Sequence, residues 1–291
     1  MVLATLQHIS PLERYETEKP YFLNIAENES SREVPQTNLE YSPQDGIRIE
    51  NIRERGFPAF SLQTNGFEIL NYKSVTTLEN PTEDIGTFCE EMARVIKVKY
   101  NAVHVFCYDY RIRKNNTNIM DYDKGENYGR ENAAPPVFPV HIDHTVEGGL
   151  KRIRRHLTEL EASMYLTPNF KARIINLWRP LRTPVEECPI AICDPRSIDP
   201  ADLLAADRVT PDFALEVYYV KYNPNQKWFW LPNQTTDEFL VFVNYDSDCR
   251  LDKSPWMTCP HAAFVEPGSS DGAALRESVE VRLIVFTPTE A

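Results

Sequence analysis

The chain has 291 residues, of which 42% are hydrophobic and 11% aromatic, so it can bury a sizeable core and is not expected to be disordered. Its formal net charge of -12 argues against a protein that coats nucleic acid, because such proteins normally present a basic face to the phosphates. No stretch approaches the roughly 18 apolar residues of a membrane span, and the first residues do not resemble a signal peptide. We therefore expect a cytoplasmic protein with neither nucleic acid nor membrane as a partner.

The six cysteines include no CxxC pair, so the spacing typical of a tetrahedral zinc site is absent. In the cytoplasm they are expected to be free thiols. One basic run, at residues 151–155, has two interpretations. We favour one solvated face of a helix, and the alternative is a patch for an anionic substrate or partner.

Residues 1–45 are polar and irregular, and we interpret them as an N-terminal arm packed on a single domain that spans residues 46–291. A helix is predicted over residues 84–98, because acidic residues occupy its first turn and apolar residues recur at helical spacing. Before this helix, short apolar runs predict strands at residues 47–50, 59–62 and 67–70.

After this helix we expect an extended run over 102–112, a polar loop over 114–136, an apolar extended segment over 137–142 and a second helix over 150–165. One or two helical turns are expected at 199–206. Short strands are predicted at 173–178, 191–194, 216–221, 228–231, 238–245, 261–265 and 278–286. Short strands separated by Pro, Asn and Asp turns are typical of a barrel or jelly roll, so the predicted fold class is mainly β with flanking helices.

The central motif is His141-Ile142-Asp143. Residues two apart in a strand point to the same face, so this imidazole and carboxylate can reach one point in space. They would supply two ligands of the 2-His-1-carboxylate triad that marks non-haem iron(II) oxygenases. The pattern alone also fits a surface or hydrogen-bonded pair. Its position before a loop favours the metal site, as do His261 at the start of a later apolar run and Arg276 beyond it.

Arg276 has a physical reason to follow such a triad. 2-Oxoglutarate would chelate iron through its keto-acid end, and its far carboxylate would then need a buried cation. Arginine suits this role because its planar fork pairs bidentately with a carboxylate. Ser278 shares one face of the strand with Arg276, and Arg282 on the same parity is the alternative anchor. The competing interpretation is that these arginines only pair with Glu277 or Glu280.

Sequence blocks along most of the chain carry a resemblance to a known family. The longest are Asn-Leu-Trp-Arg-Pro-Leu at residues 176–181 and Arg-Glu-Ser-Val-Glu-Val-Arg at residues 276–282. With them the chain resembles the fungal and bacterial hydroxylases and desaturases of secondary metabolism, which are non-haem iron(II)- and 2-oxoglutarate-dependent oxygenases. The family includes the aspergillic acid hydroxylase, gibberellin desaturase-like proteins and a component of cephamycin 7-methoxylation.

The resemblance implies a double-stranded β-helix, a jelly roll of the cupin-like type, and a dioxygenase that uses Fe(II), 2-oxoglutarate and O2. It places the metal on His141, Asp143 and His261. The implied substrate is a small secondary metabolite or an amino-acid-derived compound. Hydrogen abstraction would lead to hydroxylation, desaturation or an oxidative cyclisation such as aziridine formation. Many such enzymes form homodimers, and no coiled-coil heptads are present to indicate one.

Asn176 and Arg179 lie in one of the matching blocks, and Tyr108 and Tyr110 are placed on the entry side of the barrel without support from a matching block. Asn176 or Arg179 could touch 2-oxoglutarate or substrate, depending on which face of their strand looks into the barrel. We predict Asn176 as a cofactor-binding residue, and Arg179, Tyr108 and Tyr110 as substrate-binding residues. Trp178 is expected to pack in the core.

Two other functions stay open from the residues. One is a metal-dependent hydrolase that holds zinc with the same ligands, which would not need Arg276. The other is a β-barrel binding protein without metal-dependent activity, which an intact ligand set argues against.

Overall fold

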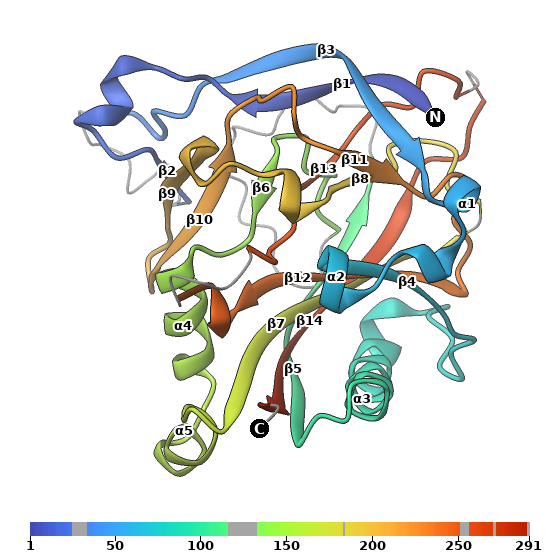
Figure 1. Cartoon of the computed structure of the whole chain (residues 1–291). Coiled ribbons are helices and arrows are strands. Elements are labelled where there is room, and N and C mark those ends of the chain that lie inside the picture. The colour runs from blue at the N-terminus through green and yellow to red at the C-terminus, as the bar shows by residue number, and fades with distance from the viewer. Residues whose placement is uncertain (25–33, 116–132, 183, 251–255, 270–271, 290–291) are drawn as a thin grey trace.

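The computed structural model describes residues 1–24, 34–115, 133–182, 184–250, 256–269 and 272–289. Two β-sheets face each other (Figure 1). The nine-stranded sheet has the order β1 (Val2–Ile9), β3 (Tyr41–Asn51), β11 (Trp228–Trp230), β8 (Ile190–Cys193), β13 (His261–Ala263), β6 (His141–Ile142), β10 (Ala214–Val220), β9 (Leu203–Val209), β2 (Tyr21–Leu23). The five-stranded sheet has the order β4 (Phe67–Asn71), β12 (Glu238–Asp246), β7 (Phe170–Pro180), β14 (Glu277–Pro288), β5 (His104–Lys114).

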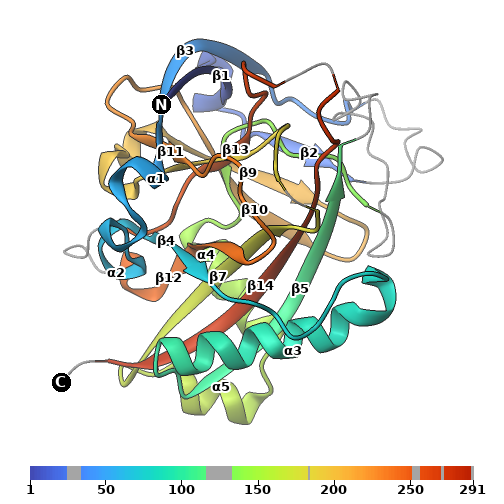
Figure 2. The ribbon, with the colours of Figure 1, turned by 90° about the vertical axis from the view of Figure 1, so that its right-hand side faces the viewer.

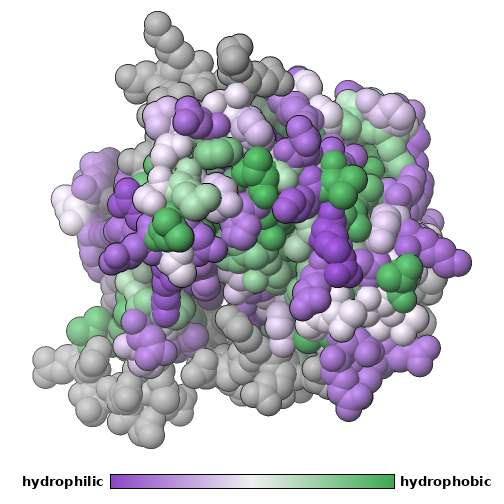
Figure 3. All heavy atoms as spheres, turned by 90° about the horizontal axis from the view of Figure 1, so that it is seen from below, coloured by the Kyte–Doolittle hydropathy of each residue, from purple (hydrophilic) through white to green (hydrophobic). Residues whose placement is uncertain are grey.

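Helices lie around this sandwich rather than inside it. The α-helices are α1 (Ile52–Arg55), α2 (Leu62–Asn65), α3 (Pro81–Lys99), α4 (Val146–Arg155) and α5 (Glu159–Tyr165). Short 3-10 turns are η1 (Glu13–Glu16), η3 (Phe57–Ala59), η4 (Pro195–Ser197), η5 (Pro200–Asp202) and η6 (Ser247–Arg250). Viewed from below, polar and apolar side chains are interspersed on the face of the molecule (Figure 3). Within the described ranges, no helix is long and apolar enough to span a membrane.

The five-stranded sheet has two different faces. Helix α3 lies across its outer face (Figure 2), and there Phe88 and Met92 pack against Val279 and Val281 of β14. The inner face packs against the nine-stranded sheet. Because side chains alternate along a strand, Glu280, which lies between these two valines, points into the space between the sheets. The arrangement is that of a double-stranded β-helix and confirms the predicted fold class.

Helices α4 and α5 lie at one end of the sandwich (Figure 1). Ile153 of α4 is fully buried against Ile174 of β7 and Ile284 of β14. The expected single helix over 150–165 is wrong, because Thr158 begins a new helix. Its side chain and that of Glu161 form a capping box at the start of α5, which satisfies backbone N–H groups that a continuous helix would have used otherwise.

Two other local predictions are wrong. The strand expected at 59–62 is replaced by η3 and α2, because Ser61 caps α2 by accepting a hydrogen bond from the Thr64 N–H. The helical turns expected at 199–206 end with η5, and β9 follows at once. Most of the expected loop over 114–136 lies outside the described residues.

The N-terminal segment carries more regular structure than the expected arm. Strand β1 pairs antiparallel with β3, and β2 pairs parallel with β9, so both belong to the nine-stranded sheet. Strand β3 also runs across residue 45, where we place the boundary between arm and domain. The division at this residue stays a prediction.

Glu91 ties the segment after β4 to helix α3. Its carboxylate accepts hydrogen bonds from the hydroxyls of Tyr72 and Ser74, at 2.9 and 2.8 Å, and from the N–H groups of Val75 and Thr76, at 2.8 and 3.0 Å. Burial alone would raise the pKa of Glu91, but these hydrogen bonds outweigh it and lower the pKa to about 2.

Glu91→Gln is expected to lower the free energy of unfolding at pH 7 by about 1–3 kcal/mol, because a neutral amide replaces a carboxylate that accepts several hydrogen bonds. The folded pKa of about 2 lies below the ordinary 4.5, so the stabilisation is present above pH 4.5 and is lost as the pH falls toward 2. Urea unfolding at several pH values should therefore show the two proteins converging in acid. The exposed neighbour Glu90 provides the control, since Glu90→Gln should change stability by less than about 0.5 kcal/mol. Equal losses of unfolding free energy in both variants would contradict a stabilising role for the hydrogen bonds of Glu91.

Candidate active site

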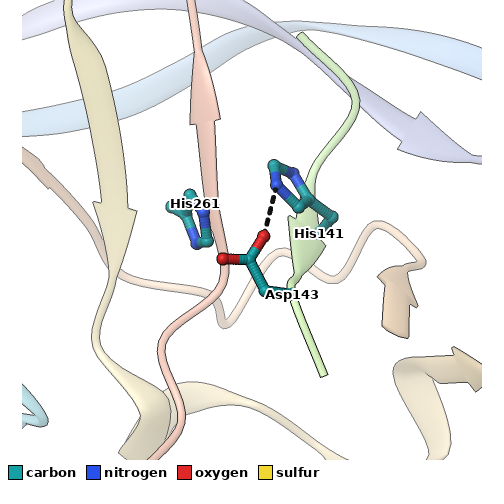
Figure 4. A group of neighbouring side chains, drawn as sticks. All are labelled: His141, Asp143 and His261. Carbon is teal, nitrogen blue, oxygen red and sulfur yellow. Dashed lines mark ion pairs between the residues drawn. The ribbon is translucent and has the colours of Figure 1, made fainter. Parts of the chain in front are cut away.

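The three predicted metal ligands come from neighbouring strands. His141 begins β6 and Asp143 follows it by two residues, while His261 begins β13 directly opposite His141. One ligand atom from each residue lies within 4.8 Å of the others. Figure 4 shows the three side chains pointing toward one another. The period-two spacing therefore places the imidazole of His141 and the carboxylate of Asp143 side by side, as the sequence predicts.

Backbone contacts orient both imidazoles for metal binding. Nδ1 of His141 donates to the Pro139 carbonyl oxygen at 2.9 Å, and Nδ1 of His261 donates to the Cys259 carbonyl oxygen at 3.1 Å. A carbonyl only accepts, so each Nδ1 carries a proton, and Nε2 is the ring atom that each histidine can offer to a metal. Burial lowers the pKa of His261 to about 4, so this ring is neutral at pH 7.

The two oxygens of Asp143 have different surroundings. Oδ2 accepts a hydrogen bond from Asn176 Nδ2 at 2.9 Å and lies 3.4 Å from Arg282 Nε. Oδ1 lies 3.5 Å from His141 Nε2 and faces the other ligands. Burial alone would raise the pKa of Asp143, but the Arg282 guanidinium and the two histidines outweigh it and hold the pKa well below its usual range. Asp143 is therefore an ionised carboxylate that presents Oδ1 to the site.

A buried polar network continues from Asp143 Oδ2. Arg282 Nε donates to Glu280 Oε1 at 3.0 Å, and Arg282 Nη1 donates to Asp109 Oδ2 at 3.1 Å. Asn176 Nδ2 also reaches Glu280 Oε1 at 2.5 Å. The sequence analysis names Glu280 only as a competing partner for the arginines. Glu280 shares one face of β14 with Ser278 and Arg282, and this period-two spacing is the signal that places it in the site.

Arg276 lies in the same pocket as the two histidines of the triad. This pocket is lined by His141, His261, Trp178, Arg276 and Glu280, among others. Arg276 is only 4% exposed, its Nη1 donates to the Cys188 carbonyl oxygen, and its guanidinium carbon lies 5.5 Å from the centre of the Trp178 ring. Trp178 thus packs in the core and also lines the pocket.

The structure does not bring all predicted substrate residues to the triad. Arg179 donates to the Thr236 carbonyl oxygen and stacks over Phe88 of α3, at 4.7 Å from the ring centre. Tyr110 packs against the same outer cluster. A substrate-binding role for Arg179 and Tyr110 therefore needs correction, because the face of the sheet that carries them is covered by α3. Tyr108 lies on the inner face, and its hydroxyl is hydrogen-bonded to His144 Nε2 at 3.0 Å.

The donor set fits a mononuclear divalent metal. Two imidazoles and one carboxylate lie within reach of one ion, and such a set would leave further coordination positions for other ligands. This is the arrangement expected for Fe(II), and its chemistry agrees with the prediction from the His-x-Asp motif.

Comparisons with known proteins agree with this geometry. A family model described as an oxidoreductase/YMDC permease-like domain matches residues 6–286. The alpha-ketoglutarate-dependent dioxygenase phiK of Fungal sp. (strain ATCC 74256) is 29% identical over 82% of this chain and 83% of its own length. The hydroxylase/desaturase efuI of Hormonema carpetanum is 29% identical over 91% and 92% of the two chains.

A solved structure shares the fold across the whole chain. The iron and alpha-ketoglutarate-dependent endoperoxidase NvfI superposes with a TM-score of 0.79 at 24% identity, covering 99% of this chain and 98% of its own. The curated relatives confirm the resemblance to fungal hydroxylases and desaturases, and the structural match confirms the jelly-roll fold.

Asn176→Ala is expected to weaken binding of a divalent metal about 10- to 100-fold, because Asp143 Oδ2 loses a hydrogen bond that helps to orient it. Anaerobic calorimetry with Fe(II), or with Mn(II) as a stable substitute, would measure this change. Asn223→Ala is the matched control, since Asn223 donates to Asp202 at 2.8 Å outside the contacts of the triad. Wild-type metal affinity in Asn176→Ala would show that Asp143 does not depend on this contact.

Proposed function

The chain belongs to the family described as an oxidoreductase/YMDC permease-like domain, and we propose that it is an Fe(II)- and 2-oxoglutarate-dependent dioxygenase acting on a small molecule. One observation carries the proposal: the two histidines of a His, Asp, His set line one pocket together with a buried arginine. The relatives named alpha-ketoglutarate-dependent dioxygenase and hydroxylase/desaturase support the same chemistry.

His141, Asp143 and His261 would hold the iron. When bound, Fe(II) together with 2-oxoglutarate and O2 supplies the oxidising power for hydrogen abstraction from the substrate. The protein contributes orientation: backbone carbonyls fix both imidazole rings, while Asn176 and Arg282 hold one oxygen of Asp143 and leave the other for the metal.

Arg276 is the proposed anchor for the far carboxylate of 2-oxoglutarate. It lies beside the triad, and burial strengthens a bidentate ion pair there because little water competes for it. Ser278 is fully buried on the same face of β14, and its Oγ has no hydrogen-bond partner among the residues that the structure describes, so it can donate to the same carboxylate. The alternative anchor, Arg282, already contacts three carboxylates.

The proposed substrate is a small secondary metabolite or an amino-acid-derived compound. The relatives' names include hydroxylase, desaturase and endoperoxidase, so outcomes differ among proteins similar to this one. A displacement of about 1 Å in substrate placement can change which atom reacts. We therefore propose that the walls of the pocket decide among hydroxylation, desaturation and ring closure. A cytoplasmic location and a homodimeric assembly stay predictions.

Anaerobic addition of Fe(II) and 2-oxoglutarate to the metal-free protein is expected to produce a visible metal-to-ligand charge-transfer band. Asp143→Ala should abolish the band, because it removes the one anionic ligand of the set. Absorption spectroscopy of both proteins, with bound iron quantified, is the measurement. Bound iron without a band in the wild-type protein would remove the oxygenase from consideration and favour a metal-dependent hydrolase.

Arg276→Ala is expected to raise the dissociation constant of 2-oxoglutarate at least about 30-fold, from the roughly 2 kcal/mol or more lost with one partner of a buried charge pair. It should leave the affinity for Fe(II) alone unchanged. Arg282→Ala should instead weaken Fe(II) binding itself, because Arg282 contacts Asp143 directly. Titration of each ligand separately distinguishes the two arginines. A larger loss of 2-oxoglutarate affinity in Arg282→Ala, at unchanged Fe(II) affinity, would transfer the anchor role to Arg282.

A further inference from the structure

Helix α4 brings an unusual arginine to the end of the sandwich next to the triad. The helix begins at Val146, three residues after Asp143, and Thr145 caps it by accepting a hydrogen bond from the Gly148 N–H. Arg152 lies two turns along and is half-buried, whereas Arg154 on the same helix is exposed. One member of the basic run, which we interpret as a solvated face, is therefore partly removed from solvent.

Two aromatic rings hold the Arg152 guanidinium. Its central carbon lies 5.6 Å from the centre of the Tyr108 ring and 5.3 Å from that of Phe213, at distances where a cation is attracted to a ring face. Among the described residues it makes no hydrogen bond or ion pair with a carboxylate, and its Nε is buried without an acceptor. The guanidinium is thus held by two rings without a bound carboxylate from the part of the chain that the structure describes.

The carboxylate that acts on Arg152 electrostatically, that of Asp109, is already engaged. It lies 3.1 Å from Arg282 Nη1 and 3.8 Å from Arg111 Nε. Burial lowers the pKa of Arg152 from its ordinary value, which reflects the cost of holding its charge away from water. A guanidinium does not lose its proton in a protein, so it remains a desolvated cation. An incoming anion would offset that cost.

Polar groups connect Arg152 to the metal ligands. The Tyr108 ring that packs against the guanidinium carries the hydroxyl bonded to His144, and His144 directly follows Asp143 in the chain. His144 is 5% exposed, and its Nδ1 has no hydrogen-bond partner within the described residues. This corner therefore offers a cation, an unsatisfied imidazole nitrogen and two aromatic rings, and Arg276 lies in a separate set of contacts with Trp178 and Cys188.

We propose that Arg152 binds the carboxylate of the primary substrate, with the Tyr108 and Phe213 rings against the apolar body of the same molecule. The inference rests on the proposed function and assigns a substrate class to it: an organic acid with an apolar or aromatic body. Arg276 would hold the cosubstrate carboxylate and Arg152 the substrate carboxylate, so the two acids would not compete for one cation. Tyr108 then regains the substrate role predicted from the sequence.

The test compares wild-type protein with Arg152→Gln, Arg152→Lys and Arg154→Gln, each loaded anaerobically with Fe(II) and 2-oxoglutarate. The probes are cinnamate and decanoate, each paired with its neutral amide, and calorimetry measures their binding. Wild type and Arg154→Gln should bind the acids about 10- to 100-fold more tightly than the amides, as a charged hydrogen-bonded pair allows. Arg152→Gln should lose this preference and Arg152→Lys should keep part of it, with 2-oxoglutarate affinity unchanged in all four proteins.

Failure of this inference is distinguishable from failure of the proposed function. Absence of the charge-transfer band in wild type would overturn the proposed function, and the same probes would then be titrated into the metal-free protein. Equal binding of acids and amides by wild type would overturn the substrate assignment. A preference for the acids that survives in Arg152→Gln would do the same, leaving Arg152 as a structural contact that joins α4 to the rings. Thermal melting of each variant confirms that it is folded before titration.

Discussion

The site depends on one buried guanidinium, that of Arg282. Strand register places it directly opposite Asn176 on β7 and Asp109 on β5, so the sheet itself delivers two of its neighbours. Asp143 and Glu280 complete the set. A buried cation is tolerated only where anions and hydrogen bonds compensate for lost water. Arg282 therefore joins the five-stranded sheet to the metal ligand that extends from the other sheet.

Several charged side chains surround Asp143. Three carboxylates contact Arg282, and that of Asp109 also lies 3.8 Å from Arg111 Nε, so three carboxylates share two guanidinium groups. A divalent cation at the candidate ligand set would add positive charge next to Asp143, and the imidazoles of His141 and His261 would supply nitrogen ligands. Two further guanidinium groups lie outside this network. Arg276 lines the triad pocket, and Arg152 lies against the ring of Tyr108 at the end covered by α4.

The two faces of the five-stranded sheet explain which neighbouring residues share the site. Asn176 contacts Asp143, whereas Arg179, three residues later, stacks on Phe88 under α3. Helix α3 covers one face with apolar side chains, and the nine-stranded sheet covers the other. Since side chains alternate along a strand, neighbouring residues of β7 and β14 alternate between the face that α3 covers and the face that contains the site.

Local periodicity in the sequence determined much of the secondary structure and part of the candidate site. It predicted the His-x-Asp pair on one face, the shared parity of Arg276, Ser278 and Arg282, helix α3 and most of the strands. The recognisable blocks at 176–181 and 276–282 indicated the family. Tertiary structure alone decided which face of β7 looks inward, that Glu280 and Asp109 converge on Arg282, and that Arg152 lies between two rings from distant parts of the chain. A period of two relates residues within one strand, but contacts between strands depend on register and on what packs against each face.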